Sequence, residues 1–195
     1  MTEKLTNQLN FIIEADKLKS VERQNLLIDK SRRENTAEHS WHFALMAMTL
    51  YEYAADVVDI NRVIKMAIVH DLVEVYAGDT FAFDEKGYES KLQRENEAAD
   101  KLFSLLPPEK ATEYRGLWQE FDQMKTPDAM YAAAIDVLHP ALMNSLTDGH
   151  PWVKHGVTSA KVFGRLAPVK TAIPALWEFV EQIVSEAIEK GWLKR

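Results

Sequence analysis

The sequence contains no cysteine, which excludes structural disulfides, thiolate metal sites and a nucleophilic cysteine mechanism. Glycine and proline are scarce, at seven residues each, whereas 47% of the residues are hydrophobic. This balance is typical of a globular chain rather than a disordered one. A chain of 195 residues is long enough to enclose a core, and we expect one domain that spans residues 1–195.

Basic residues are fewer than acidic ones, 23 against 30, and the formal net charge is −7. Binding of DNA or RNA polymers requires a basic face, so we expect no nucleic-acid partner. The longest apolar stretch, residues 43–55, contains Glu52 and falls short of the roughly 20 residues that a membrane span needs. The first ten residues lack the pattern of a secretory signal. The sequence therefore predicts a soluble, cytoplasmic protein without a membrane partner.

The hydrophobic pattern predicts helices along nearly the whole chain. Apolar residues recur at three- and four-residue spacings, and no run shows the sustained alternation of a strand. Asn35 and Asn61 are the expected N-caps of the second and third helices, and Gly78 is the expected end of the third. We expect helices at about 4–18, 35–56, 61–78, 89–106, 108–124, 127–147, 157–166 and 173–190, with irregular segments at 19–38, 79–88 and 148–156. The predicted fold class is all-α.

Imidazole and carboxylate groups interrupt three of these apolar helix faces. His39 lies in one helix, the adjacent His70 and Asp71 in the next, and Asp136 in a third. A buried charge without a partner is unfavourable, and a shared metal ion would satisfy all four groups. Two imidazoles and two carboxylates suit one divalent ion, and Mn, Co, Zn, Ni, Fe and Mg all remain open.

Two further carboxylates stand close to these candidate ligands. Glu74 follows His70 by four residues and so shares its expected helix face. A bound metal lowers the pKa of a coordinated water, and a nearby carboxylate can orient that water or take its proton. Asp79 follows the helix end and is placed to protonate a leaving oxygen. The alternatives are a solvated helix position for Glu74 and a turn position for Asp79.

Three arginines precede the helix that carries His39. Arg23, Arg32 and Arg33 have the planar guanidinium that recognises phosphate through two hydrogen bonds. This suggests an anion pocket, with Arg23 and Arg32 as candidate substrate-binding residues. The alternative is a salt-bridged surface, for which Glu34 and Glu38 are available partners.

The remaining histidines have simpler interpretations. His42 and His139 each lie three residues from a candidate ligand and are interpreted as packing residues, with a supporting role at the metal as the alternative. His150 and His155 lie in a segment with proline and glycine and are expected to be structural or exposed.

The order of His39, His70-Asp71 and Asp136 resembles the signature of the HD-domain superfamily of metal-dependent phosphohydrolases. More narrowly, the segments ENTAEHS, HDLVEVYAGD and AAAIDVLHP are similar to the compact helical branch that includes bacterial 5′-deoxynucleotidases. The resemblance covers about residues 10–190. It implies a compact HD-domain helical bundle with a buried metal site, assembled as a homodimer.

The resemblance also implies roles for single residues. By position, His39, His70, Asp71 and Asp136 would be the metal ligands, and Glu74 and Asp79 would handle the water and the leaving group. Arg23 would orient the substrate phosphate, and the run Asp79, Thr80, Phe81 and Ala82 would contact the substrate. Gln24 stands where the deoxynucleotidases carry a tryptophan that discriminates against the ribose 2′-hydroxyl.

The predicted function is the release of phosphate from small phosphomonoesters, with (deoxy)nucleoside 5′-monophosphates as the first choice. Two alternatives remain. One is a non-catalytic nucleotide-binding or regulatory module, and the other is a di-iron oxygenase on the same scaffold. The oxygenase requires further histidine or carboxylate ligands, and no second histidine follows near His70.

Overall fold

A computed structural model describes residues 2–195. Over this range the chain forms ten α-helices and one antiparallel hairpin of two short strands, which confirms the predicted all-α class. The helices are α1 (Glu3–Ala15), α2 (Thr36–Leu50), α3 (Ile60–Val69), α4 (Glu74–Ala77), α5 (Glu85–Phe103), α6 (Pro108–Gln123), α7 (Pro127–Leu146), α8 (His150–His155), α9 (Ser159–Ala172) and α10 (Trp177–Glu189). The strands are β1 (Glu22–Leu26) and β2 (Arg33–Asn35).

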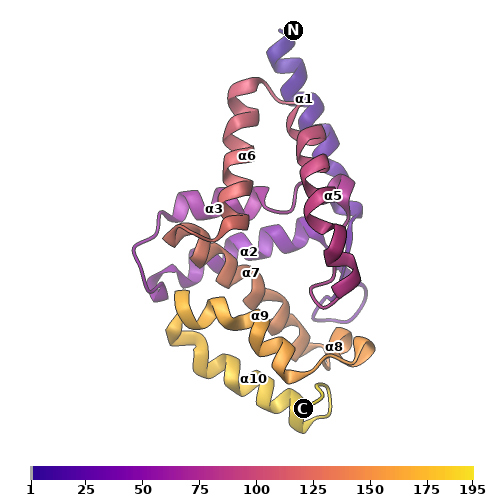
Figure 1. The fold of residues 1–195 in the computed structure, drawn as a ribbon, viewed down its shortest axis with the longest axis vertical. Helices are drawn as coiled ribbons and strands as arrows, with labels where there is room; N and C mark the ends of the chain where they lie inside the picture. The colour runs from indigo at the N-terminus through magenta and orange to yellow at the C-terminus, as the bar shows by residue number, and fades with distance from the viewer. Residues whose placement is uncertain (1) are drawn as a thin grey trace.

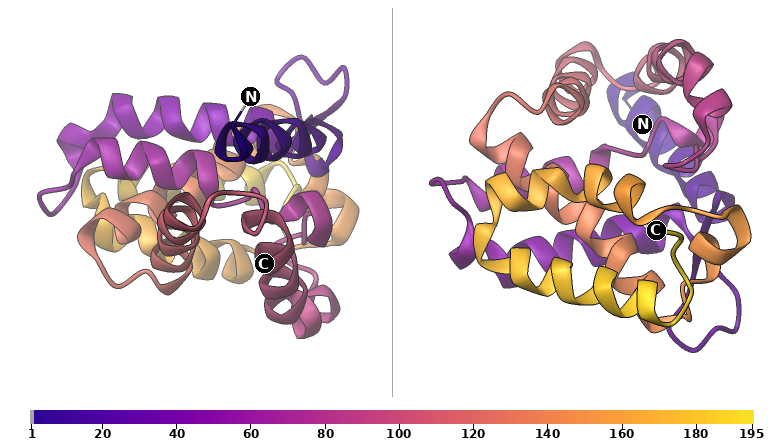
Figure 2. Two further views of the ribbon diagram at one scale, coloured as in Figure 1. Left: turned by 90° about the horizontal axis from the view of Figure 1, so that it is seen from above. Right: turned by 60° about the horizontal axis from the view of Figure 1, so that its bottom comes forward.

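The helices are arranged in three groups along the longest axis of the molecule. Helices α1, α5 and α6 lie at one end, α2, α3 and α7 in the middle, and α8, α9 and α10 at the other end (Figure 1). The rotated views show α10 running beside α9, which in turn packs against α7 (Figure 2). Within residues 2–195, no helix is both long enough and apolar enough to cross a membrane.

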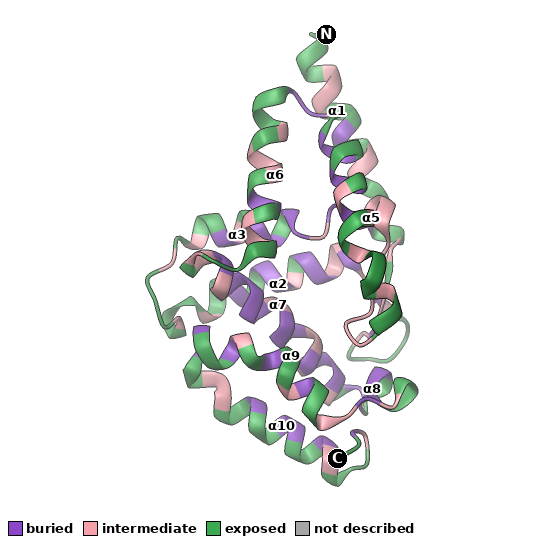
Figure 3. Cartoon of the chain, in the orientation of Figure 1, coloured by how far each residue is buried: buried purple, intermediate pink, exposed green. Residues whose placement is uncertain are grey.

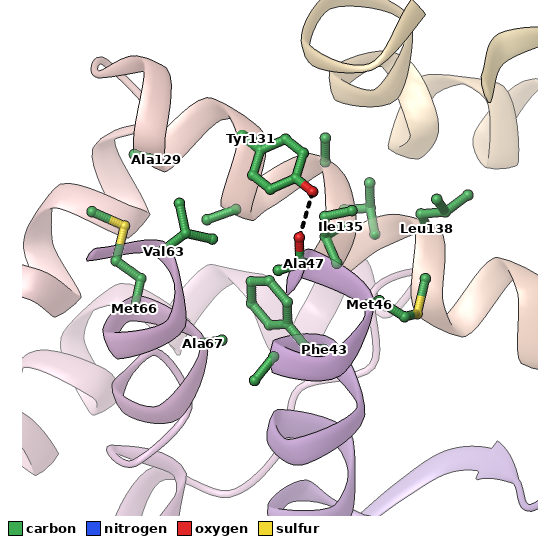
Figure 4. Close-up of a cluster of buried hydrophobic side chains, with 14 of the residues drawn as sticks. Phe43, Met46, Ala47, Val63, Met66, Ala67, Ala129, Tyr131, Ile135 and Leu138 are labelled. Atoms are coloured by element: carbon green, nitrogen blue, oxygen red, sulfur yellow. Dashed lines mark hydrogen bonds between the residues drawn. The ribbon is translucent and has the colours of Figure 1, made fainter. Parts of the chain in front are cut away.

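Helix α7 forms the centre of the core. It packs against α2, α3, α6 and α9, and most of its length is buried (Figure 3). Its sequence is apolar on all sides and rich in alanine, which lets neighbouring helices approach closely. Phe43 from α2 and Val63 from α3 lie against this helix, and the Tyr131 hydroxyl donates a 2.8 Å hydrogen bond to the carbonyl of Ala47 (Figure 4). The middle group is therefore a rigid base for any side chain that it carries.

The helix starts follow local capping rules. Asn35 and Glu38 form the predicted capping box, since each side chain accepts from the other residue's backbone N–H, at 3.0 and 3.1 Å. The prediction of Asn61 as the cap of the third helix was wrong. The cap is Asp59, whose carboxylate accepts from the backbone N–H groups of Asn61 and Arg62. An aspartate two residues earlier satisfies the free N–H groups of the first turn instead.

The third helix also differs from the prediction in that it is interrupted. Helix α3 ends at Val69, residues 70–73 form turns, and the short helix α4 follows. Gly78 ends α4 with a φ of +74°, as expected of a glycine at that position.

Other segments gained structure relative to the sequence prediction. The arginine-rich segment contains the β1–β2 hairpin, with Glu22 opposite Asn35. Helix α5 begins at Glu85, α8 occupies part of the expected loop at 148–156, and α9 continues through Pro168 to Ala172.

Candidate metal centre and active-site cavity

The four predicted metal ligands lie around one point. The Asp136 Oδ1 atom is 3.0 Å from His39 Nε2 and 3.6 Å from His70 Nε2. The Asp71 Oδ2 atom is 3.0 Å from His70 Nε2 and 3.8 Å from His39 Nε2. Helices α2 and α7 and the end of α3 thus bring two imidazole nitrogens and two carboxylate oxygens together.

His70 and Asp71 lie where the α-helical bonding of α3 gives way to tighter turns. Here the backbone turns tightly after α3, with the Leu72 N–H bonded to the carbonyl of Val69 at 3.1 Å. The His70 ring is fixed as well, because its Nδ1 lies 2.9 Å from the Ala67 carbonyl, which can only accept. The ring therefore carries its proton on Nδ1 and directs Nε2 at the aspartates.

Arg23 reaches the same site from the hairpin. Its guanidinium lies 3.2 Å from Asp71, 3.5 Å from Asp79 and 3.7 Å from Glu34. The strand that carries it is anchored on α7, where the Asn25 side chain donates to the Asn144 side chain at 2.7 Å. Burial disfavours the charge of Arg23, but the carboxylates of Asp79 and Asp71 outweigh it and raise the pKa of the guanidinium. Arg23 is therefore a fixed positive charge beside the ligands.

Glu74 and Asp79 both have a raised proton affinity. Glu74 is buried and accepts a 2.9 Å hydrogen bond from the Thr36 hydroxyl. Burial and the nearby charges of Asp71 and Asp79 raise the pKa of Glu74 well above its usual value. Burial also raises the pKa of Asp79, and Asp71 adds to this effect although Arg23 opposes it. Carboxyl groups with a raised pKa keep their protons to higher pH than usual and are suited to proton transfer.

These groups face a cavity of about 380 Å³, a volume that suits a small molecule. The predicted substrate-contacting residues Gln24, Asp79, Thr80, Phe81 and Ala82 line it together with Arg23. His39 lies behind the wall and is fully buried. The Gln24 side-chain oxygen accepts from Lys154 at 3.4 Å and from His155 at 3.3 Å, at the edge of the cavity.

Arg32 is the one predicted substrate-binding residue that the structure does not bring to the cavity. It is exposed, and its guanidinium donates to the Glu38 carboxylate at 2.8 Å and to the carbonyl of Arg33 at 2.9 Å. Glu38 is also the capping-box residue of α2, so Arg32 is held at the helix start instead. Arg32 therefore forms a surface salt bridge, which was the alternative to a substrate-binding role.

Charged residues that no sequence signal predicted also lie at the site. Lys91 from α5 and Arg165 from α9 line the cavity, and the Arg165 guanidinium lies 3.8 Å from Asp136. Glu34 was considered only as an arginine partner, but it is buried beside Arg23, and burial raises its pKa to about 7 although Arg23 opposes this. Neither cation belongs to a recognisable motif, because tertiary packing alone brings α5 and α9 to this wall.

The charge and hydrogen bonding of the site fit a divalent cation. Five carboxyl groups, those of Glu34, Asp71, Glu74, Asp79 and Asp136, lie around the Arg23 guanidinium, and the Arg165 guanidinium lies 3.8 Å from Asp136, so carboxyl groups outnumber guanidinium groups. Burial disfavours protonation of His70, but Asp71 and Asp136 outweigh it and raise the pKa of the ring to about 10. The buried His70 Nε2 also has no hydrogen bond of good geometry to any group within residues 2–195, despite the two nearby carboxylates. A divalent cation that displaced the Nε2 proton would give this nitrogen a partner, and two imidazoles with carboxylate oxygens form a donor set of intermediate hardness.

The bundle and its converged histidines and aspartates define an all-helical domain with a buried candidate site for a divalent metal. The sequence profile described as "HD domain" matches residues 15–177, and the chain therefore belongs to the HD-domain family. A crystal structure from Magnetospirillum magnetotacticum MS-1, described as a predicted metal-dependent phosphohydrolase, is 48% identical in sequence. It superposes with a TM-score of 0.94 over 99% of this chain and 97% of that one.

Curated relatives are more distant. Human 5′-deoxynucleotidase HDDC2 is 30% identical over 129 residues, which are 66% of this chain and 62% of the human protein. The protein of the same name from Dictyostelium discoideum is 30% identical over 138 residues and 73% of its length. The match thus spans about three fifths of the human relative. An HD-domain phosphohydrolase from Listeria innocua, at 18% identity and a TM-score of 0.59, supports the fold alone.

Proposed function

We propose that this chain is a divalent-metal-dependent phosphohydrolase that releases phosphate from (deoxy)nucleoside 5′-monophosphates. The observation that carries the proposal is the shared cavity of Arg23 and the His–Asp cluster, because a phosphate there can contact both the Arg23 guanidinium and the neighbouring metal-binding groups. The names of the Magnetospirillum structure and of the HDDC2 relatives support the same chemistry.

The proposed metal ligands are His39, His70, Asp71 and Asp136, and the ion is one of Mn, Co, Zn, Ni, Fe or Mg. Such an ion, when bound, polarises a phosphate oxygen and makes a nearby water more acidic. Both imidazoles would bind through Nε2, because Nδ1 of His70 lies against the Ala67 carbonyl and Nδ1 of His39 lies 2.9 Å from His139.

The protein's own groups divide the remaining work. Arg23 binds the phosphate and stabilises the negative charge that develops during the reaction, and its carboxylate neighbours hold it in place. Glu74 takes a proton from the attacking water. Asp79 gives a proton to the oxygen that leaves with the nucleoside, so the products are a nucleoside and inorganic phosphate.

A phosphate-release screen tests this function. We expect turnover of ribo- or deoxynucleoside 5′-monophosphates with at least one of Mn²⁺, Co²⁺, Zn²⁺ and Mg²⁺. Glu74→Gln removes the base without changing the shape of the side chain and should slow turnover roughly 10²-fold or more, with the metal still bound. Unchanged turnover in this variant would exclude Glu74 as the base. Tight nucleotide binding without turnover in every metal would instead favour a regulatory module.

Gln24 is the proposed determinant of sugar preference. Its amide lies at the cavity edge and can hydrogen-bond a ribose 2′-hydroxyl, whereas a large ring would exclude that group. Replacing Gln24 by Trp should shift the ratio of kcat/KM values towards deoxyribonucleotides on the order of tenfold, about one net hydrogen bond. Gln24→Leu is the matched control, because it removes the amide without adding a ring. If the ratio of kcat/KM values in both the Trp and the Leu variant equalled that of the wild type, this role of Gln24 would be excluded.

We also propose that residues 1–195 act as one domain and that two copies form a homodimer. Trp41, Leu45 and Met48 share one face of α2 and are 62%, 44% and 53% exposed, which is unusual for such large apolar side chains. Sedimentation equilibrium would contradict the dimer by showing a monomer at micromolar concentration. The cytoplasmic location remains a prediction from the sequence.

A further inference from the structure

Three histidines on α2 and α7 form a hydrogen-bonded chain that leads away from the metal ligands. His39 Nδ1 lies 2.9 Å from His139 Nδ1, and His139 Nε2 lies 3.0 Å from His42 Nδ1. The rings of His39 and His139 are fully buried, whereas His42 is half-buried at the outer end. Because both nitrogens of His139 are hydrogen-bonded, its buried ring is satisfied and is held in one orientation.

The direction of each hydrogen bond among these three histidines follows from the requirement that His39 binds a metal through Nε2. If His39 binds a metal through Nε2, its neutral ring carries the proton on Nδ1 and donates it to His139 Nδ1. His139 then carries its own proton on Nε2 and donates it to His42 Nδ1. Glu34 Oε1, at 3.5 Å from the same His139 nitrogen, favours a proton there too. Each ring is thereby assigned a single tautomer.

We propose that His139, supported by His42 and Glu34, is a positioning residue that holds His39 in the tautomer and orientation required of a metal ligand. The inference rests on the metal site of the proposed function. His139 touches neither the metal nor the substrate in this arrangement and acts only through His39. This role replaces the packing role that the sequence favoured for His139 and His42.

A comparison with His70, the other proposed ligand histidine, shows why a mutation can remove the hydrogen bond that holds His39. The Nδ1 of His70 is held by a backbone carbonyl, which no substitution of a side chain removes. At His39 the corresponding acceptor is a side chain, so it can be deleted. The cluster of Glu34, His39 and His139 does not provide a second metal site of its own, because the two imidazole Nδ1 atoms face each other at hydrogen-bonding distance.

A pair of variants separates positioning from packing. The side-chain oxygen in His139→Asn can take the place of Nδ1 and accept from His39, whereas His139→Leu fills the space without an acceptor. We expect the leucine variant to bind Zn²⁺ about 10- to 100-fold more weakly in competition with a chromophoric chelator. The asparagine variant should stay close to the wild type. Thermal melts of the metal-free proteins show whether both variants fold.

His42, the half-buried histidine at the outer end, allows a second comparison with less risk to folding. His42→Leu should weaken Zn²⁺ binding and His42→Asn should not, with a smaller difference than at His139 because His42 is one hydrogen bond further from the metal. Long-range ¹H–¹⁵N spectra of the Zn²⁺-loaded wild type provide an independent measurement. They should show protons on Nδ1 of His39 and on Nε2 of His139 and His42.

The outcomes distinguish this inference from the function on which it rests. A wild type that binds no divalent metal would overturn the metal site and the positioning role together. If both leucine variants bound Zn²⁺ as tightly as the wild type, the positioning role alone would be overturned. The same holds if the leucine and asparagine variants bound Zn²⁺ equally weakly. A proton on His139 Nδ1 in the loaded protein would do the same.

Discussion

Replacing Asp136 by asparagine should reduce phosphate release by roughly 10³-fold or more, because the site loses both a ligand and the charge that holds the ion. The Asp136 Oδ1 atom lies within 3.6 Å of both imidazole Nε2 atoms. An amide of the same shape is neutral and a weaker ligand for a divalent cation. The measurement is the metal content per chain together with the rate of phosphate release.

Two controls accompany this variant. Asp100→Asn makes the same chemical change at a carboxylate that is 72% exposed and paired with Arg115, and it should leave metal content and rate unchanged. Wild-type protein treated with a chelator should lose activity and regain it when a divalent ion is added. An Asp136→Asn variant that keeps both its metal and its rate would refute this ligand assignment.

Replacing Arg23 by methionine should lower kcat/KM by about 10²- to 10³-fold while the metal stays bound. Methionine keeps a flexible stem in the hairpin but lacks the guanidinium that lies between Asp71 and Asp79. Lys91 and Arg165 would remain in the cavity lining, but neither lies between Asp71 and Asp79 as Arg23 does. Arg23→Lys should give an intermediate rate, since an ammonium keeps the charge but not the planar fork.

Arg32→Met is the matched control for this prediction. Arg32 comes from the same arginine-rich segment, but it is exposed and pairs with Glu38, so its loss should change stability and kcat/KM very little. The result would be decisive in either direction. If Arg23→Met changed kcat/KM no more than Arg32→Met does, the phosphate-binding role of Arg23 would be wrong.

The features that could be predicted from the sequence are those with a local or repetitive signal. The all-α class followed from the three- and four-residue spacing of apolar side chains, and the capping box at Asn35 and Glu38 followed from its residue types. The four candidate ligands stood out because each is a polar residue at an apolar helix position. Their convergence in space agrees with that argument.

The features that the sequence did not predict depend on contacts between distant segments. The β1–β2 hairpin has no alternating pattern, and it is held by side chains such as Asn25, which bonds to Asn144 on α7. The turn after α3 follows an uninterrupted apolar period and depends partly on the bond between the His70 ring and the Ala67 carbonyl. Lys91 and Arg165 reach the cavity only because α5 and α9 pack beside it.

The separation of the ligands along the chain links this site to the order of folding. His39 and Asp136 lie 97 residues apart, so a flexible chain would have to close a long loop before both could hold one ion. An ion bound there stabilises only the folded state. If the four proposed ligands hold one ion, a nascent polypeptide could not complete that site until Asp136 on α7 had left the ribosome, so metal loading would follow the synthesis of α7.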